Sequence, residues 1–129
     1  MKVDRYQTEH RDTIGADFYP ETKTDKYAID AMKHYAKKNG DITLKLESIR
    51  LADDQRTVQQ MKFEFKPEDV AYTFSLTSDL EGKMTILGLM KNYTKIAGQI
   101  KLALNPHQLP KDDRMAYAVR FIFPRMIKN

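Results

Sequence analysis

The sequence contains no cysteine. This absence excludes disulfide bonds, thiolate nucleophiles and every zinc or iron–sulfur site that depends on cysteine ligands. Apolar runs are also short, and no stretch approaches the ~20 consecutive apolar residues that a membrane-spanning helix needs. Residues 1–5 carry charges where a signal peptide would have an apolar segment. We therefore expect an intracellular, cytoplasmic protein that does not associate with membranes.

Common catalytic signatures are absent as well. The sequence has no glycine-rich phosphate loop with lysine, no dinucleotide-binding G-x-G-x-x-G, no G-x-S-x-G and no H-E-x-x-H. Asp30 and His34 have the i,i+4 spacing of two residues that could share an ion or a proton. We interpret them as a solvent-exposed helix pair, because no third ligand can be assigned nearby. The sequence therefore predicts no metal site, no cofactor and no catalytic residues.

Negative charge becomes scarce in the last third of the chain. Residues 1–81 contain 13 Lys and Arg against 16 Asp and Glu, whereas residues 82–129 contain 9 against 2. The second segment therefore carries a net charge of +7 and the first carries −3, which together make the net charge of +4. Such an asymmetry bears on the choice of partner and not on the fold.

The basic segment 82–129 suggests a nucleic-acid-binding surface. Its cations are interleaved with Tyr93, Tyr117, Phe121 and Phe123, and nucleic-acid-binding proteins combine cations for phosphates with aromatic rings for base stacking. The competing interpretation places the lysines on a solvated helix and the aromatic residues in the core, where a small domain needs them. The candidate phosphate-binding residues are Lys91, Lys95, Lys101, Arg114, Arg120 and Arg125.

Composition and patterning indicate one folded domain over residues 1–129. Apolar residues make up 41% and charged residues 31%, which is typical of globular chains, and no linker divides the sequence. The apolar residues of segment 1–23 are scattered, which predicts an irregular arm or an edge strand. A helix is expected over residues 24–38, capped by Thr24 or Asp25 and stopped by the Asn-Gly pair that follows.

Three segments alternate apolar and polar residues as half-buried β-strands do. The first covers residues 42–51 and slips in phase near Ser48, which indicates a β-bulge. The second covers residues 61–65, and a turn at Pro67 leads into the third, over residues 70–76. Together they predict an antiparallel meander whose buried side chains are Leu44, Met61, Phe63, Tyr72, Phe74 and Leu76.

Each segment after residue 77 admits both a helix and a strand. A turn at residues 79–82 followed by a strand at about 83–88 is favoured, although capping-box spacing would also start a helix there. Apolar residues over 89–104 share one helical face and predict a helix, with a strand as the alternative for its later residues. Residues 115–123 alternate as a strand ended by proline, and the alternative is a helix that starts just before them.

We predict an α+β fold in which an antiparallel β-meander of four or more strands carries two helices packed on one face. Such layouts serve many unrelated functions, so the fold alone selects none. The favoured hypothesis is a non-enzymatic binding or scaffold module that recognises a protein partner or associates with itself as a homo-oligomer. The alternatives are a nucleic-acid-binding accessory protein that uses the basic segment 82–129, and an enzyme whose pocket lies between sheet and helices.

Overall fold

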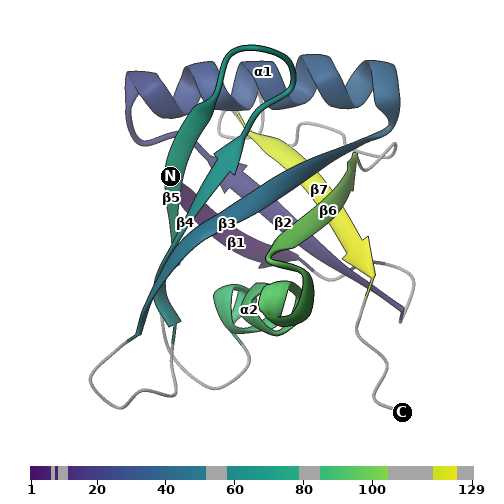
Figure 1. The fold of residues 1–129 in the computed structure, drawn as a ribbon. Helices are drawn as coiled ribbons and strands as arrows, with labels where there is room; N and C mark the ends of the chain where they lie inside the picture. Colours follow the sequence, from purple (N-terminus) through teal and green to yellow (C-terminus); the bar gives the residue numbers. More distant parts are fainter. Residues whose placement is uncertain (7, 9–11, 52–57, 79–84, 105–117, 125–129) are drawn as a thin grey trace.

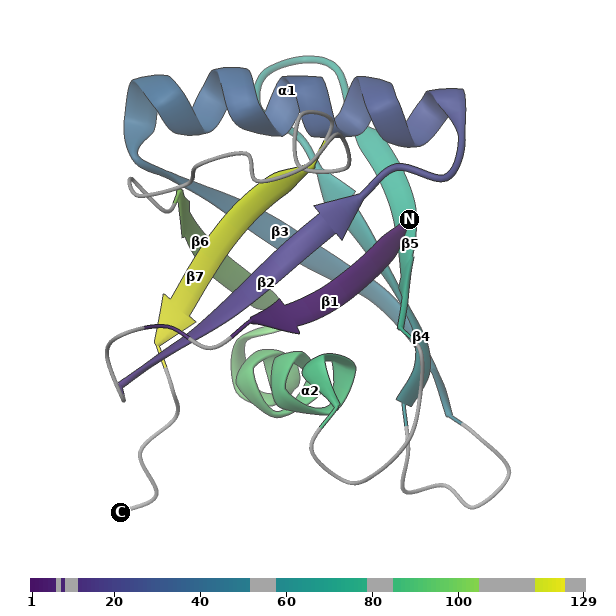
Figure 2. The same ribbon diagram turned by 180° about the vertical axis from the view of Figure 1, so that it is seen from behind.

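The computed structural model describes residues 1–6, 8, 12–51, 58–78, 85–104 and 118–124, which form a closed β-barrel with a helix at each end (Figure 1, Figure 2). The elements are β1 (Lys2–Tyr6), β2 (Thr13–Tyr19), α1 (Lys23–Asn39), β3 (Asp41–Leu51), β4 (Val58–Phe65), β5 (Tyr72–Thr77), α2 (Ile86–Ala97), β6 (Gln99–Leu104) and β7 (Val119–Pro124). The strand order around the barrel is β1-β2-β7-β6-β3-β4-β5.

The predicted α+β sheet with both helices on one face is therefore wrong. Strands β3, β4 and β5 are antiparallel neighbours, as expected, but the sheet continues through the other strands and closes on itself. Closure occurs where Lys2 of β1 pairs in parallel with Thr77 of β5, and the Thr77 backbone N–H donates to the Met1 carbonyl at 2.9 Å. A closed barrel encloses its apolar face, so the helices cover its two ends.

The described residues of segment 1–23 contribute two strands to the barrel wall, in place of the predicted irregular arm or edge strand. Strand β1 pairs with β2, and β2 pairs on its other side with β7. The inward side chains Val3, Ile14 and Phe18 are buried in the core. The apolar pattern is weak in the sequence because the strands are short and one inward position, Ala16, is small.

The barrel interior holds a core built from inward side chains of the seven described strands and one face of each helix. Five of the six side chains predicted to be buried are buried: Leu44, Met61, Phe63, Phe74 and Leu76. Tyr72 is half-buried and packs against the core. The bulge predicted near Ser48 is confirmed, because the register between β3 and β4 shifts between Leu46 and Ser48.

Helix α1 confirms the helix predicted over residues 24–38 but begins differently. Its N-cap is Thr22 instead of Thr24 or Asp25, and Asp25 completes a capping box. The Thr22 hydroxyl accepts from the Asp25 backbone N–H at 3.1 Å, while the Asp25 carboxylate accepts from the Thr22 N–H at 3.2 Å. Gly40 ends the helix with a φ of 79°, a conformation that favours glycine.

The Asp25 carboxylate is buried and accepts several hydrogen bonds. It accepts from the Glu21 backbone N–H at 2.9 Å and lies 3.1 Å from the Met1 amino group. Burial alone raises the pKa of this carboxyl, but the hydrogen bonds from Glu21, Met1 and Thr22 outweigh burial and hold the pKa below its usual value. The charged carboxylate therefore stabilises the fold above the unfolded-state pKa of ~3.9, and this contribution is lost as pH falls through the folded-state pKa.

We expect Asp25→Asn to lower the free energy of unfolding by about 1–2 kcal/mol at neutral pH, because a charged hydrogen-bond acceptor is replaced by a neutral one. The variant should also lose less stability than the wild type as pH falls from neutral to about 3. Urea unfolding over this pH range measures both effects. Asp30→Asn, at an exposed carboxylate of the same helix, is the control and should change neither quantity appreciably. An identical pH dependence in wild type and Asp25→Asn would refute this role.

The strand predicted over residues 83–88 is wrong in its described part. Residues 83 and 84 lie outside the described residues, and residues 86–88 form the first turn of α2. Thr85 is the N-cap, and its side-chain oxygen accepts from the Gly88 backbone N–H at 3.0 Å. This bond satisfies one of the free N–H groups of the first turn, which favours a helix start at this position.

The single helix predicted over residues 89–104 is two elements. Helix α2 ends at Ala97, where Gly98 adopts a left-handed φ of 69°, and the following residues form β6 with Ile100 and Leu102 buried. The later residues of the predicted helix are thus a strand, as the alternative had it. Of the two helices in the described part of the chain, neither is long and apolar enough to cross a membrane.

Strand β7 confirms the strand predicted over residues 115–123 from Val119 onward. Residues 115–117 lie outside the described residues. Phe121 and Phe123 point into the barrel and are buried, as their alternation in the sequence requires. The competing helix is therefore excluded for the described part of this segment.

Candidate functional site

Arg120, one of the predicted phosphate-binding residues, is held by contacts within the barrel wall. Its Nε and Nη2 donate to the two carboxylate oxygens of Asp17 at 2.6 and 2.7 Å, across the pairing of β7 with β2. The guanidinium carbon lies 4.2 Å from the ring centroid of Tyr6. The hydrogen bond with Asp17 raises the pKa of Arg120 above its already high value. Phosphate binding at Arg120 would require this bidentate pair to open.

Two of the other predicted cations lie together on α2. Lys91 is half-buried and Lys95 is exposed, and their i,i+4 spacing places them on one side of the helix. Lys101 lies on β6, where its Nζ is 3.1 Å from a carboxylate oxygen of β3. Arg114 and Arg125 lie outside the described residues. The nucleic-acid interface stays a prediction, and Lys91 and Lys95 are the described residues best placed to test it.

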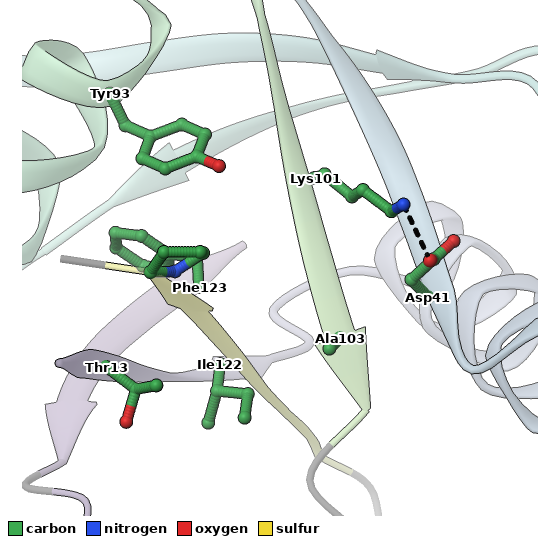
Figure 3. Close-up of a pocket in the computed structure, with 8 residues that line it drawn as sticks. Thr13, Asp41, Tyr93, Lys101, Ala103, Ile122 and Phe123 are labelled. Atoms are coloured by element: carbon green, nitrogen blue, oxygen red, sulfur yellow. Dashed lines mark ion pairs between the residues drawn. The ribbon is translucent and has the colours of Figure 1, made fainter. Parts of the chain in front are cut away.

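A small pocket opens in the barrel wall next to α2 (Figure 3). Strands β6 and β7 pair at Ala103–Ile122 and Leu104–Phe121, and the described residues of β6 before Ala103 do not pair with β7. The pocket lies where the two strands separate and has a volume of about 260 Å³. It is lined by Thr13, Asp41, Tyr93, Lys101, Ala103, Ile122, Phe123 and Pro124.

This pocket offers little chemistry. Tyr93 of α2 packs edge-on against Phe123 with ring centroids 5.6 Å apart, and most of the wall is apolar. Its two charged residues, Lys101 and Asp41, neutralise each other across 3.1 Å. The volume is below the ~300 Å³ at which small-molecule sites begin. The enzyme hypothesis requires a pocket between sheet and helices. Among the described residues that line this pocket, Lys101 and Asp41 are the only charged groups, and they are already paired with each other.

A larger groove is lined by residues of α1 and of the connection between β4 and β5. Figure 1 shows that this connection lies beside α1. The volume of the groove is about 730 Å³. One wall is a flank of α1, where Tyr27, Ala31 and Tyr35 follow one another at i,i+4 spacing. The other wall is the β4–β5 connection with the first residue of β5. The groove is lined by Thr24, Tyr27, Asp30, Ala31, His34, Tyr35, Pro67, Glu68, Val70 and Tyr72.

Buried Phe65, at the end of β4, supports two of the rings in this groove. Tyr35 packs edge-on against Phe65 with ring centroids 5.8 Å apart, and Tyr72 stacks on it at 6.3 Å. Since Tyr35 belongs to α1 and Tyr72 to β5, these contacts join the two walls. Both tyrosines are half-buried, so part of each ring remains accessible from the groove.

Exposed apolar surface is concentrated at the groove. Three large hydrophobic side chains are exposed among the described residues, and two of them line it: Tyr27, which is 66% exposed, and Val70, which is 59% exposed. The third is Leu51, on β3. The alternation in the sequence predicts a strand over residues 70–76. The strand in the structure is shorter at this end, because β5 begins at Tyr72 and Val70 remains in the connection between β4 and β5.

The charged residues that line the groove are acidic. Asp30 from α1 and Glu68 from the β4–β5 connection are both exposed, and the described lining includes no Lys or Arg. His34 is exposed one helical turn after Asp30. Burial lowers the pKa of Lys33, an effect partly offset by the attraction of Asp30. Within the described part of the chain, no three His, Asp or Glu side chains are grouped so as to hold a metal ion.

Comparison with known proteins finds no match for this chain among protein-family models, curated proteins or solved structures. The functional argument therefore depends on the geometry of the described residues. Between the small pocket beside α2 and the groove along α1, the groove is the one that combines sufficient volume with exposed apolar side chains and unbalanced charge among its described lining residues.

Proposed function

We propose that this chain is a non-enzymatic binding module that docks a segment of a partner protein in the groove between α1 and the β4–β5 connection. The observation that carries the proposal is the convergence of Tyr27 and Val70, both largely exposed, on that one groove. Apolar surface exposed to water is unfavourable, and contiguous patches of it mark interaction sites. A partner that covers both side chains removes this surface from water.

The shape of the groove favours a peptide segment over a small molecule. A small-molecule site encloses most of its ligand, whereas two side chains that line this groove, Tyr27 on α1 and Val70 in the β4–β5 connection, are largely exposed. Tyrosine is enriched among the residues that dominate binding energy at interfaces, because its ring offers a large contact area with few rotatable bonds. The carboxylates of Asp30 and Glu68 supply the polar rim of such an interface.

The absence of cysteine supports the cytoplasm as the compartment in which this partner is met. The competing occupant of the groove is a second copy of the chain. Self-association has some electrostatic support, since the basic segment 82–129 of one copy would be attracted to the acidic groove of another. The oligomeric state therefore has to be measured alongside binding.

Selection of phage-displayed random linear peptides on the purified chain tests the proposal. We expect the selected peptides to bind the wild type in fluorescence anisotropy, and to bind Tyr27→Ser/Val70→Ser at least about tenfold more weakly, because truncating buried interface anchors removes most of the binding energy. Leu51→Ser is the matched control. It truncates the exposed hydrophobic side chain outside the groove, and should change the affinity by less than about twofold.

Two outcomes would contradict this function. If no peptide is selected, or if the selected peptides bind wild type and Tyr27→Ser/Val70→Ser equally well, the groove is not the binding site. Analytical ultracentrifugation addresses the competing occupant. A wild-type dimer that becomes monomeric in Tyr27→Ser/Val70→Ser would assign the groove to self-association in place of a partner protein.

A further inference from the structure

We infer that the groove selects its partner through a cationic side chain, lysine or arginine, which lies against the tyrosine rings and between the carboxylates of Asp30 and Glu68. The inference rests on the proposed function and specifies what the partner segment must present. Three features of the lining carry it: aromatic faces, negative charge on both walls, and no Lys or Arg among the described lining residues.

The aromatic feature consists of Tyr27, Tyr35 and Tyr72. Tyr35 and Tyr72 reach the groove from different elements and are both packed on Phe65, at centroid distances of 5.8 and 6.3 Å. Tyr27 lies two helical turns before Tyr35 on the same flank of α1, with the small residue Ala31 between them. The face of a tyrosine ring is electron-rich and attracts ammonium and guanidinium groups. The rings can therefore hold a cation as well as the apolar stem that carries it.

The electrostatic feature is the sign of the charge on the lining residues. Asp30 lies on α1 and Glu68 on the opposite wall, so the lining carries a formal charge of −2 with His34 neutral, in a chain whose net charge is +4. Complementary charge sets the choice and orientation of a partner more than the raw affinity. An acidic or phosphorylated segment would be repelled, and a neutral segment would gain no electrostatic attraction from either carboxylate.

Each carboxylate has a lysine near it in the sequence. Lys33 follows Asp30 by three residues on α1 and already interacts with its charge, although Lys33 does not line the groove. Lys66 precedes Glu68 by two residues in the β4–β5 connection and does not line the groove either. The single variants Asp30→Asn and Glu68→Gln therefore measure how much each carboxylate contributes to the selectivity for a cation.

The peptides selected on the wild type test this inference. We expect them to be enriched in lysine or arginine. Replacing the anchoring lysine by norleucine, which keeps the four-carbon stem and lacks the ammonium group, should weaken binding to the wild type about tenfold and to Asp30→Asn/Glu68→Gln less than about twofold. Glu47→Gln neutralises an exposed carboxylate of β3 outside the groove and should keep the full tenfold difference. Fluorescence anisotropy gives each dissociation constant.

A second probe does not depend on the selection. Choline and its uncharged isostere 3,3-dimethylbutan-1-ol are titrated into separate samples of the protein. The ring resonances of Tyr35 and Tyr72 are followed by NMR in both titrations. We expect choline to shift these resonances saturably and the alcohol to leave them in place, since only choline carries the charge. Asp30→Asn/Glu68→Gln should weaken choline binding.

The outcomes separate this inference from the proposed function. Peptides that require Tyr27 and Val70 but bind equally well with lysine or norleucine would overturn the cation and leave the docking groove intact. Absence of groove-dependent peptides would overturn the docking function. In that case, an equal response to choline and the alcohol, or no response to either, would overturn the cation site independently.

Discussion

Replacing Phe63 with alanine is expected to lower the free energy of unfolding by about 3–5 kcal/mol. The Phe63 ring is fully buried inside the barrel, and its centroid lies 6.4 Å from that of Phe74 on the neighbouring strand. Truncation removes the apolar surface of the ring and leaves a cavity. Strand β4 is paired on both sides, so the wall cannot collapse to fill that cavity. Urea unfolding followed by circular dichroism measures the loss.

Two further variants test whether the loss comes from burial in the core. Phe74→Ala, at the cross-strand partner of Phe63, should show a loss of similar size. Leu51→Ala truncates an apolar side chain of β3 that is 39% exposed, and should cost less than about 1 kcal/mol. If both phenylalanine variants unfold at the wild-type urea concentration, these side chains do not form the core of the barrel.

The second large effect is expected at the pair between Asp17 and Arg120, where Asp17→Ala should cost about 3 kcal/mol. Asp17 is only 4% exposed, and both of its carboxylate oxygens accept from Arg120. The variant removes both of these charge-assisted hydrogen bonds from a guanidinium that lies against the ring of Tyr6. The expected loss is at the lower end for buried pairs, because the Arg120 side chain is 20% exposed. Urea unfolding measures this loss as well.

Two comparisons distinguish the effect of losing the ion pair from the effect of truncating a side chain. Asp41→Ala removes the carboxylate that pairs with Lys101, in a pair whose side chains are 35% and 66% exposed, and should cost less than about 1 kcal/mol. Asp17→Ala/Arg120→Met should be more stable than the two single losses predict, by at least about 1 kcal/mol, because no buried charge is left unpaired. Equal losses for Asp17→Ala and Asp41→Ala would show that the first pair behaves as an ordinary surface ion pair.

Gly15 illustrates how closely the outer wall around this pair is packed. A Cβ atom at Gly15 would overlap the ring of Tyr6, its cross-strand neighbour. The absence of a side chain at Gly15 thus lets Tyr6 lie flat on β2, where it also covers the guanidinium of Arg120. The sequence shows a glycine between apolar residues here, and only the pairing of β1 with β2 explains it.

Local sequence patterns were sufficient to predict features that depend on a single helix or strand. The period of two along β4 and β5 predicted the burial of Phe63 and Phe74, and the period of 3.6 predicted α1. The predicted stop after residue 38 was also correct, since Gly40 takes the left-handed conformation. The helix expected over 89–104 failed for an equally local reason. Ile100 continues the apolar spacing of α2, whereas Gly98 ends the helix in a left-handed conformation and the residues after it pair with β3.

Only the α1 side of the groove could be predicted from the sequence. The row of Tyr27, Ala31 and Tyr35 on one flank of α1 was a usable signal for an aromatic surface, but nothing local indicated that Val70 and Glu68 would lie opposite it. The pairing of Arg120 was also hidden in the sequence. Arg120 resembled the other cations of the basic segment because its partner Asp17 lies 103 residues away in the sequence.

Residue order alone therefore determined α1, the strands β3 to β5 and the alternating core, since these follow from the periodicity of neighbouring residues. Tertiary structure decided four features: the closure of the barrel, the placement of the helices at opposite ends, the pairing of Arg120 with Asp17, and the groove lined by tyrosines and carboxylates. Each depends on residues far apart in the chain, such as Lys2 opposite Thr77 or Asp17 against Arg120. Such contacts form only when the whole sheet has closed, and no local period encodes them.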